Sequence, residues 1–74
     1  MNIENLVMMA NDIANFFASE PDHVAAVAGV ANHLKRYWEP RMRTQIMAHV
    51  AAGGSGLTPA ALSAVRTLPP APQR

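Results

Sequence analysis

The sequence predicts an all-α fold, a small bundle of three main helices followed by a short C-terminal helix and a disordered Pro-rich tail. Apolar residues recur at steps of three and four along most of the chain, which is the period of an amphipathic helix. No segment alternates apolar and polar residues over five or more positions, as half-buried strands do. Prolines and glycines divide the chain into short helical segments. We expect one helical domain over residues 1–68 and a flexible tail over 69–74.

The first helix is expected from about Ile3 to Ala18, with Asn2 as its N-cap. Its inner face is predicted to hold seven residues, Ile3, Leu6, Val7, Ala10, Ile13, Ala14 and Phe17. Met9 and Phe16 lie at the edge of this stripe and form a second apolar ridge. That ridge packs either on another helix of the domain or on a partner.

The second helix is expected to follow a break at residues 19–22, with Ser19 available as its cap, and to run to about Trp38. Its predicted inner face is Val24, Val27, Ala28, Ala31, Leu34 and Trp38, widened by Val30 and Tyr37. Gly29 in its middle costs about 1 kcal/mol relative to alanine. Either another element approaches closely there or the glycine is simply tolerated.

Two proline residues mark the starts of the remaining helices. The pair Glu39-Pro40 ends the second helix and opens a third, which runs to about Ala52 and stops at Gly53-Gly54. Its expected inner side is Met42, Ile46, His49 and Val50. Thr58-Pro59 opens a last helix to about Leu68, whose apolar stripe is Ala61, Leu62, Val65 and Leu68.

Composition narrows the classes of function. A chain of 74 residues without cysteine builds a thin core and has no disulfide, so a partner is the expected source of extra stability. The net charge of +1 divides into −4 over residues 1–22 and +5 over the rest, far from the basic excess of a dedicated nucleic-acid binder. No apolar run approaches the roughly 20 residues of a membrane span, and the acidic start lacks a basic leader. We expect a cytoplasmic protein without a membrane partner.

No arrangement of residues typical of catalysis or metal binding is found. The three histidines, at 23, 33 and 49, are never three or four apart, and the acidic residues are scattered singly. The glycine-rich run 53–56 follows a helix and lacks a lysine, unlike a phosphate-binding loop. We expect no catalytic residue, metal or cofactor in this chain.

The basic bend, residues 35–43, concentrates four of the six basic residues with the only Trp and Tyr. Its first two cations end a helix, where the dipole favours them, but Arg41 and Arg43 begin the next, where it does not. A carboxylate or phosphate on a partner would explain these two arginines, unless Glu39 holds one internally. Candidate partner-binding residues are Lys35, Arg36, Tyr37, Trp38, Arg41, Arg43, Met9 and Phe16. Trp38 lies on an apolar stripe and suits the core better than an interface.

Several runs together resemble a known family. They are Leu6-Val7-Met8-Met9-Ala10-Asn11, Ile13-Ala14 before Phe16-Phe17, Val27-Ala28-Gly29-Val30-Ala31 with His33, Tyr37-Trp38-Glu39-Pro40-Arg41-Met42-Arg43 and Ala51-Ala52-Gly53-Gly54-Ser55-Gly56-Leu57-Thr58-Pro59. Over roughly residues 5–68 the chain resembles the delta subunit of soluble NAD-dependent (molybdenum/tungsten) formate dehydrogenase.

The resemblance implies a non-catalytic accessory subunit of a cytoplasmic oxidoreductase complex. Its partner would be the catalytic large subunit, whose assembly or stability it supports. Molybdopterin guanine dinucleotide, iron-sulfur clusters and FMN would belong to partner subunits, with none in this chain. Two alternatives remain: a helical nucleic-acid-binding module using the basic bend, whose affinity would fall steeply with salt, and an assembly factor that leaves before turnover.

Overall fold

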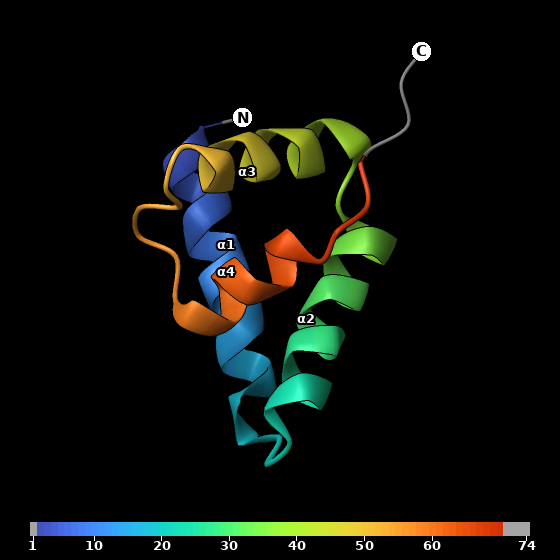
Figure 1. The fold of residues 1–74 in the computed structure, drawn as a ribbon. Coiled ribbons are helices and arrows are strands. Elements are labelled where there is room, and N and C mark those ends of the chain that lie inside the picture. Colours follow the sequence, from blue (N-terminus) through green and yellow to red (C-terminus); the bar gives the residue numbers. More distant parts are fainter. Residues whose placement is uncertain (1, 71–74) are drawn as a thin grey trace.

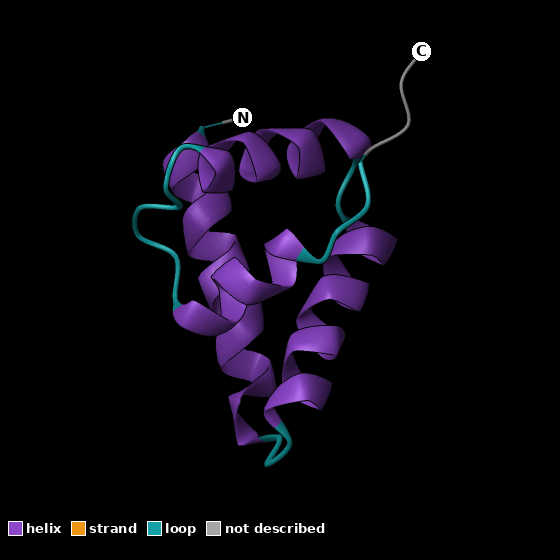
Figure 2. Ribbon diagram, in the orientation of Figure 1, coloured by secondary structure: helices purple, strands orange, loops and turns teal. Residues whose placement is uncertain are grey.

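The computed structural model describes residues 2–70 and confirms the all-α prediction. The elements are α1 (Ile3–Phe16), the 3-10 turn η1 (Phe17–Ser19), α2 (His23–Tyr37), α3 (Pro40–Ala51) and α4 (Pro59–Arg66). Figure 2 shows these helices joined by short loops, and no strand occurs between residues 2 and 70. Pro69 and Pro70 have no regular secondary structure, and residues 71–74 of the expected tail lie outside the described residues.

Helices α1 and α2 form an antiparallel hairpin that is narrow at its turn and wide at its other end (Figure 1). Helix α3 lies across the wide end, and α4 lies in front of the two arms in this view. Helix α4 contacts the other three helices, whereas α3 contacts mainly α1 and α4. None of the helices within residues 2–70 is long and apolar enough to cross a membrane.

The helix starts follow their capping chemistry, with one correction. The side chain of Asn2 accepts from the Glu4 amide at 2.7 Å, as predicted. The N-cap of α2 is Asp22, not Ser19, and its carboxylate accepts from the amide of Val24 at 3.0 Å. The prediction of Ser19 was wrong because Pro21 keeps the residue before it out of the helical region. The second helix therefore begins only after that proline.

Glycines end α3 at the predicted place. The amide of Gly53 donates to the carbonyl of Val50, and the amide of Gly54 donates to that of His49 at 2.9 Å. These two bonds, made by residues with positive φ, form a Schellman motif. Gly54 is buried, and a Cβ atom there would lie 2.5 Å from a methyl group of Leu62 on α4. Alanine at Gly54 would therefore collide with α4 as well as strain the backbone.

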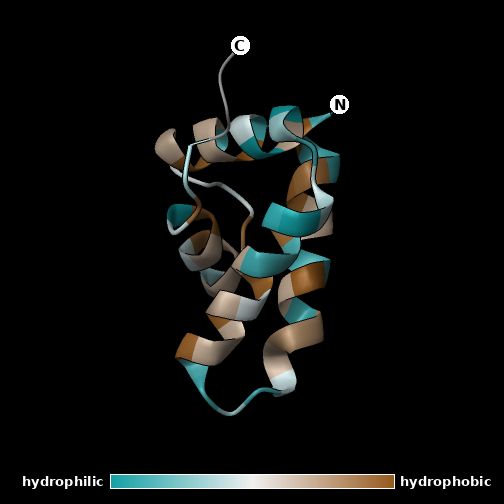
Figure 3. Ribbon diagram, turned by 90° about the vertical axis from the view of Figure 1, so that its right-hand side faces the viewer, coloured by the Kyte–Doolittle hydropathy of each residue, from teal (hydrophilic) through white to brown (hydrophobic). Residues whose placement is uncertain are grey.

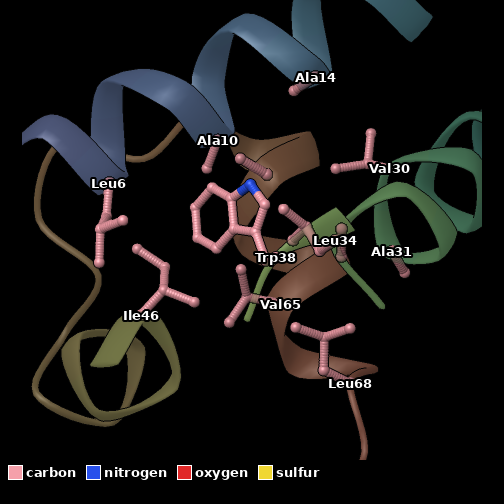
Figure 4. Close-up of a cluster of buried hydrophobic side chains, with 12 residues drawn as sticks. Leu6, Ala10, Ala14, Val30, Ala31, Leu34, Trp38, Ile46, Val65 and Leu68 are labelled. Atoms are coloured by element: carbon pink, nitrogen blue, oxygen red, sulfur yellow. The ribbon is translucent and has the colours of Figure 1, made fainter. Parts of the chain in front are cut away.

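A single hydrophobic cluster joins all four helices, with Trp38 at its centre (Figure 4). Leu6, Val30, Leu34, Ile46 and Val65 are its largest fully buried side chains. They come from α1, α2, α3 and α4, so each helix is held by the same core. The core buries no polar or charged side chain among the described residues.

The predicted inner face of α2 was partly wrong. Val24 is 75% exposed, and Ala28 and Tyr37 are also exposed, whereas Val30 is buried as predicted and Ala26, which was not predicted, is buried too. An alanine- and valine-rich helix offers several apolar stripes, and packing against α1 and α4 selects the one that includes Val30. Periodicity alone does not distinguish these stripes.

Candidate partner-binding surface

Three cations of the basic bend are exposed. Lys35 and Arg36 occupy the last turn of α2, and Arg41 follows Pro40 at the start of α3. Within residues 2–70 no ion pair joins Glu39 to an arginine, so the internal pairing considered from the sequence is not made there. These three positive charges are therefore free to meet a partner's acceptors.

Arg43 behaves differently and corrects the prediction that local stability does not explain it. Its Nη1 atom donates to the carbonyl oxygen of Lys35 at 2.8 Å. That carbonyl belongs to the last turn of α2, where no further helical amide follows to bond it. The Nε atom of Arg43 is buried and has no hydrogen-bond partner among the described residues. Arg43 therefore caps α2 from α3 and fixes the angle of the bend.

Tyr37 and its neighbours form an ordered aromatic group at the end of α2. The Tyr37 side chain is 67% exposed, although the centroid of its ring lies 4.7 Å from the ring centroid of His33, one helical turn earlier. The guanidinium of Arg36 lies 5.9 Å from the Tyr37 ring centroid, within reach of a cation–π contact. The exposed aromatic surface is thus flanked by a positive charge.

Trp38 belongs to the fold rather than to the surface. Only 6% of it is exposed, and Figure 4 shows its indole among side chains from the surrounding helices. The preference for a core position, inferred from its apolar stripe, matches this placement. A partner cannot reach the side chain without opening the core.

The two ridge residues of α1 have different environments. Met9 is half-buried and packs against the hydrophobic core. Phe16 is 77% exposed, and its ring meets that of Phe17 edge to face at a centroid distance of 5.1 Å. Phe16 is therefore the large apolar side chain of this ridge that a partner could cover.

Sequence reasoning missed Asn11, which holds the glycine-rich run in place. Its amide nitrogen donates to the carbonyl of Gly56 at 2.9 Å, and its amide oxygen accepts from the backbone amide of Thr58 at 2.9 Å. His49 adds a third link, with Nε2 2.7 Å from the carbonyl oxygen of Ser55. A lone asparagine beside an apolar stripe was the available signal. The run after α3 thus has a structural role in joining α1 to α4.

Two surface hollows flank these elements. One, of 430 Å³, is lined by residues of α1, η1, α2 and α4, among them His23, and by Glu20 of the loop before α2. The other, of 360 Å³, lies between α1 and the loop after α3, and its histidine, His49, is the one that meets the Ser55 carbonyl. Within residues 2–70, no three histidine or carboxylate side chains lie close enough together to hold a metal ion.

Comparison with known proteins identifies a family. The family model described as the NADH-dependent formate dehydrogenase delta subunit, FdsD, matches residues 5–65. No curated protein and no solved structure matches the chain. The match covers most of the chain and confirms the resemblance drawn from its sequence runs, so the chain belongs to this delta-subunit family.

Proposed function

From this membership we propose that the chain is a non-catalytic accessory subunit that binds the catalytic large subunit of a cytoplasmic formate dehydrogenase. In this proposal it supports the assembly or stability of that subunit, and the partner subunits hold the molybdopterin guanine dinucleotide, iron-sulfur clusters and FMN. One observation carries the proposal. The four helices bury a common core, whereas two large aromatic side chains, Phe16 and Tyr37, are exposed on the surface. The three exposed cations of the basic bend, which form no ion pair within residues 2–70, lie on the surface as well.

These residue types suit a protein interface. Tyrosine and arginine are among the residues that contribute most to binding energy when a partner desolvates them. Arginine also forms paired hydrogen bonds with carboxylates. Arg36 beside Tyr37 and Arg41 across the bend supply both kinds of contact. A partner with acidic and apolar side chains would complement them.

Co-purification tests this proposal. The tagged chain should retain the large subunit, and Arg41→Glu should weaken that retention because it reverses a free cation. Arg66→Glu is the matched control, since Arg66 is an exposed arginine in the last turn of α4 and the charge change is the same. Equal retention of both variants and the wild type would exclude Arg41 from the interface. Failure of the wild-type chain to retain any subunit would overturn the proposed function.

A second experiment separates assembly from a lasting structural role. The large subunit purified from cells lacking this chain should contain less metal and less formate-oxidising activity than the subunit from complete cells. A one-to-one content of this chain in the mature enzyme would exclude a factor that leaves before turnover. Full metal content and activity without the chain would contradict both roles.

The nucleic-acid alternative has become weaker. It uses four cations of the basic bend, and one of them, Arg43, is bound to the Lys35 carbonyl. Three remaining phosphate contacts predict a fall in affinity of about 2.7 log units per log unit of salt. Binding of DNA or RNA with a slope of that size would favour this alternative over the accessory-subunit function.

A further inference from the structure

On the side of the hairpin away from α4, half-buried and mostly apolar residues border the line along which the two arms pack, and this strip of surface is here called the hairpin groove. Its floor consists of half-buried residues from both arms. They are Met9 and Ile13 of α1, Phe17 of η1, and Gly29 and His33 of α2. The contact between Phe17 and Gly29 sets the register, because a Cβ atom added at Gly29 would lie 2.7 Å from the Phe17 ring. One helical turn further along each antiparallel arm, Ile13 and His33 become neighbours.

No other helix of the described chain covers this face. Asn11, on the opposite side of α1, bonds the loop that leads into α4, so α4 is fixed on that side. In the side view of Figure 3, no further described helix lies beyond the α1–α2 pair on the side away from α4. The half-exposed floor of the hairpin groove is therefore open.

Two ordered aromatic side chains stand at the ends of the hairpin groove. Phe16 is held edge to face on Phe17, and Tyr37 is held against His33, so each exposed ring rests on a residue of the floor. Eight residues of α2 separate Gly29 from Tyr37, a helical rise of about 12 Å. That length matches two turns of a helix laid along the groove.

The charge at the Tyr37 end indicates what the occupant carries. Arg36 is exposed, with its guanidinium 5.9 Å from the centroid of the Tyr37 ring, and it forms no ion pair within residues 2–70. Figure 3 shows the same polarity along the hairpin, with hydrophobic residues toward its turn and hydrophilic residues in the last turns of α2. An occupant that is apolar over Phe16 and acidic over Arg36 complements this pattern.

The size of the face favours a single helix over a second copy of the chain. Two helices of 14 and 15 residues are about 21 Å long, and, at about 10 Å across each, they are about 20 Å wide side by side. They present on the order of 400 Å², half of the roughly 800 Å² per partner that a stable dimer buries. A helix in a groove needs only apolar residues along one face, here two of them about two turns apart, opposite Phe16 and Tyr37.

We propose that the hairpin groove binds one amphipathic helix of the formate dehydrogenase complex, with its acidic end against Arg36. The inference rests on the proposed function and adds where the partner binds and what chemistry it carries. The occupant would complete a three-helix arrangement with α1 and α2.

Photo-crosslinking in the purified complex tests the groove. A benzophenone amino acid replaces Phe16 in one variant, Tyr37 in a second and Ala48, an exposed residue of α3, in a control. We expect the Phe16 and Tyr37 positions to crosslink to one short helical segment of another subunit, with acidic residues nearer the Tyr37 position, and the Ala48 position not to do so. Crosslinks from Ala48 alone, or from Phe16 to another copy of this chain, would overturn the proposal.

A charge exchange provides the second measurement. Arg36→Glu should weaken binding at least tenfold. It should lower the thermal midpoint of the isolated chain by no more than about 8 °C, the effect of a negative charge at the end of α2. An acid-to-lysine change in the crosslinked segment should restore binding. Absence of rescue would refute the acidic end of the occupant. If the complex forms but the crosslinks lie elsewhere, the proposed binding of a helix in the hairpin groove is wrong, while the proposed function stands. If no complex forms with the unmodified chain, the proposed function itself fails.

Discussion

Arg41 and Arg43 lie two residues apart at the start of α3, and their side chains have different partners. Arg43 turns back to the Lys35 carbonyl, whereas Arg41 remains exposed. The difference depends on the angle between α2 and α3, because only one arginine can reach the open end of α2. The sequence shows that both arginines lie at a helix N-terminus, where the dipole disfavours a positive charge. It does not show which of the two donates to a carbonyl of the preceding helix.

Arg43→Met should lower the free energy of unfolding by about 1 kcal/mol. A hydrogen bond from a charged donor contributes roughly 1.5–3 kcal/mol, and the loss is smaller here because methionine also removes the buried, unpaired Nε atom. For a chain of this size the thermal midpoint should fall by about 4–8 °C. Arg41→Met, measured in parallel by circular dichroism, should stay within about 0.5 kcal/mol of the wild type. Equal losses in both variants would contradict the capping role of Arg43.

Gly29 provides a second prediction at the residue scale. In the wild-type background, Gly29→Ala gains about 1 kcal/mol of helix propensity but displaces the Phe17 ring, at a cost of roughly 1–3 kcal/mol. We expect a net loss of stability in chemical denaturation. In a Phe17→Ala background the collision is absent, so the same change should stabilise the fold. A gain in both backgrounds would mean that the glycine is merely tolerated.

Among the elements, the most predictable features were those fixed by local chemistry. Pro40, Gly53-Gly54 and Thr58-Pro59 set helix ends that the sequence located within two residues. Features that depend on packing were harder to predict. Val24 is exposed because α1 and α4 pack against another apolar stripe of α2. Which side of the hairpin is left uncovered depends on the position of α4. Phe16 was identified as a ridge residue from its spacing, but its support by Phe17 required the structure.

The link between α1 and the glycine-rich run yields a prediction at the element scale. Asn11→Ala should cost about 1–2 kcal/mol, because it leaves the Gly56 carbonyl and the part-buried Thr58 amide without their partner. Asn15→Ala, one turn later on the same helix, is the matched control, since the side chain of Asn15 makes no hydrogen bond within the described residues. Urea unfolding should show an unchanged or slightly higher stability for the control. Similar losses at both positions would refute the link.

At the scale of the whole molecule, a thin core and an open groove are two consequences of one small fold. Four helices meet around Trp38, and the same helices leave one side of the hairpin without cover. A partner helix in the groove would remove apolar surface from water and so add stability that the isolated chain lacks. Binding and folding are thereby coupled, since a ligand of the folded state shifts the unfolding equilibrium.

The unfolding of the isolated chain should be a single cooperative transition. The α-helices have 8 to 15 residues, and isolated helices shorter than about 12–15 residues are marginal in water, so they should not persist once the core opens. Trp38 is the only tryptophan and lies in the shared core, so its fluorescence reports on the assembly of all four helices. Its emission shift and the loss of helical circular dichroism should coincide in urea, with a free energy of unfolding of about 3–5 kcal/mol at most. Helical signal that survives the Trp38 transition would show that part of the bundle folds without the core. In the complex, the same unfolding transition should move to a higher denaturant concentration, because the partner binds only the folded chain.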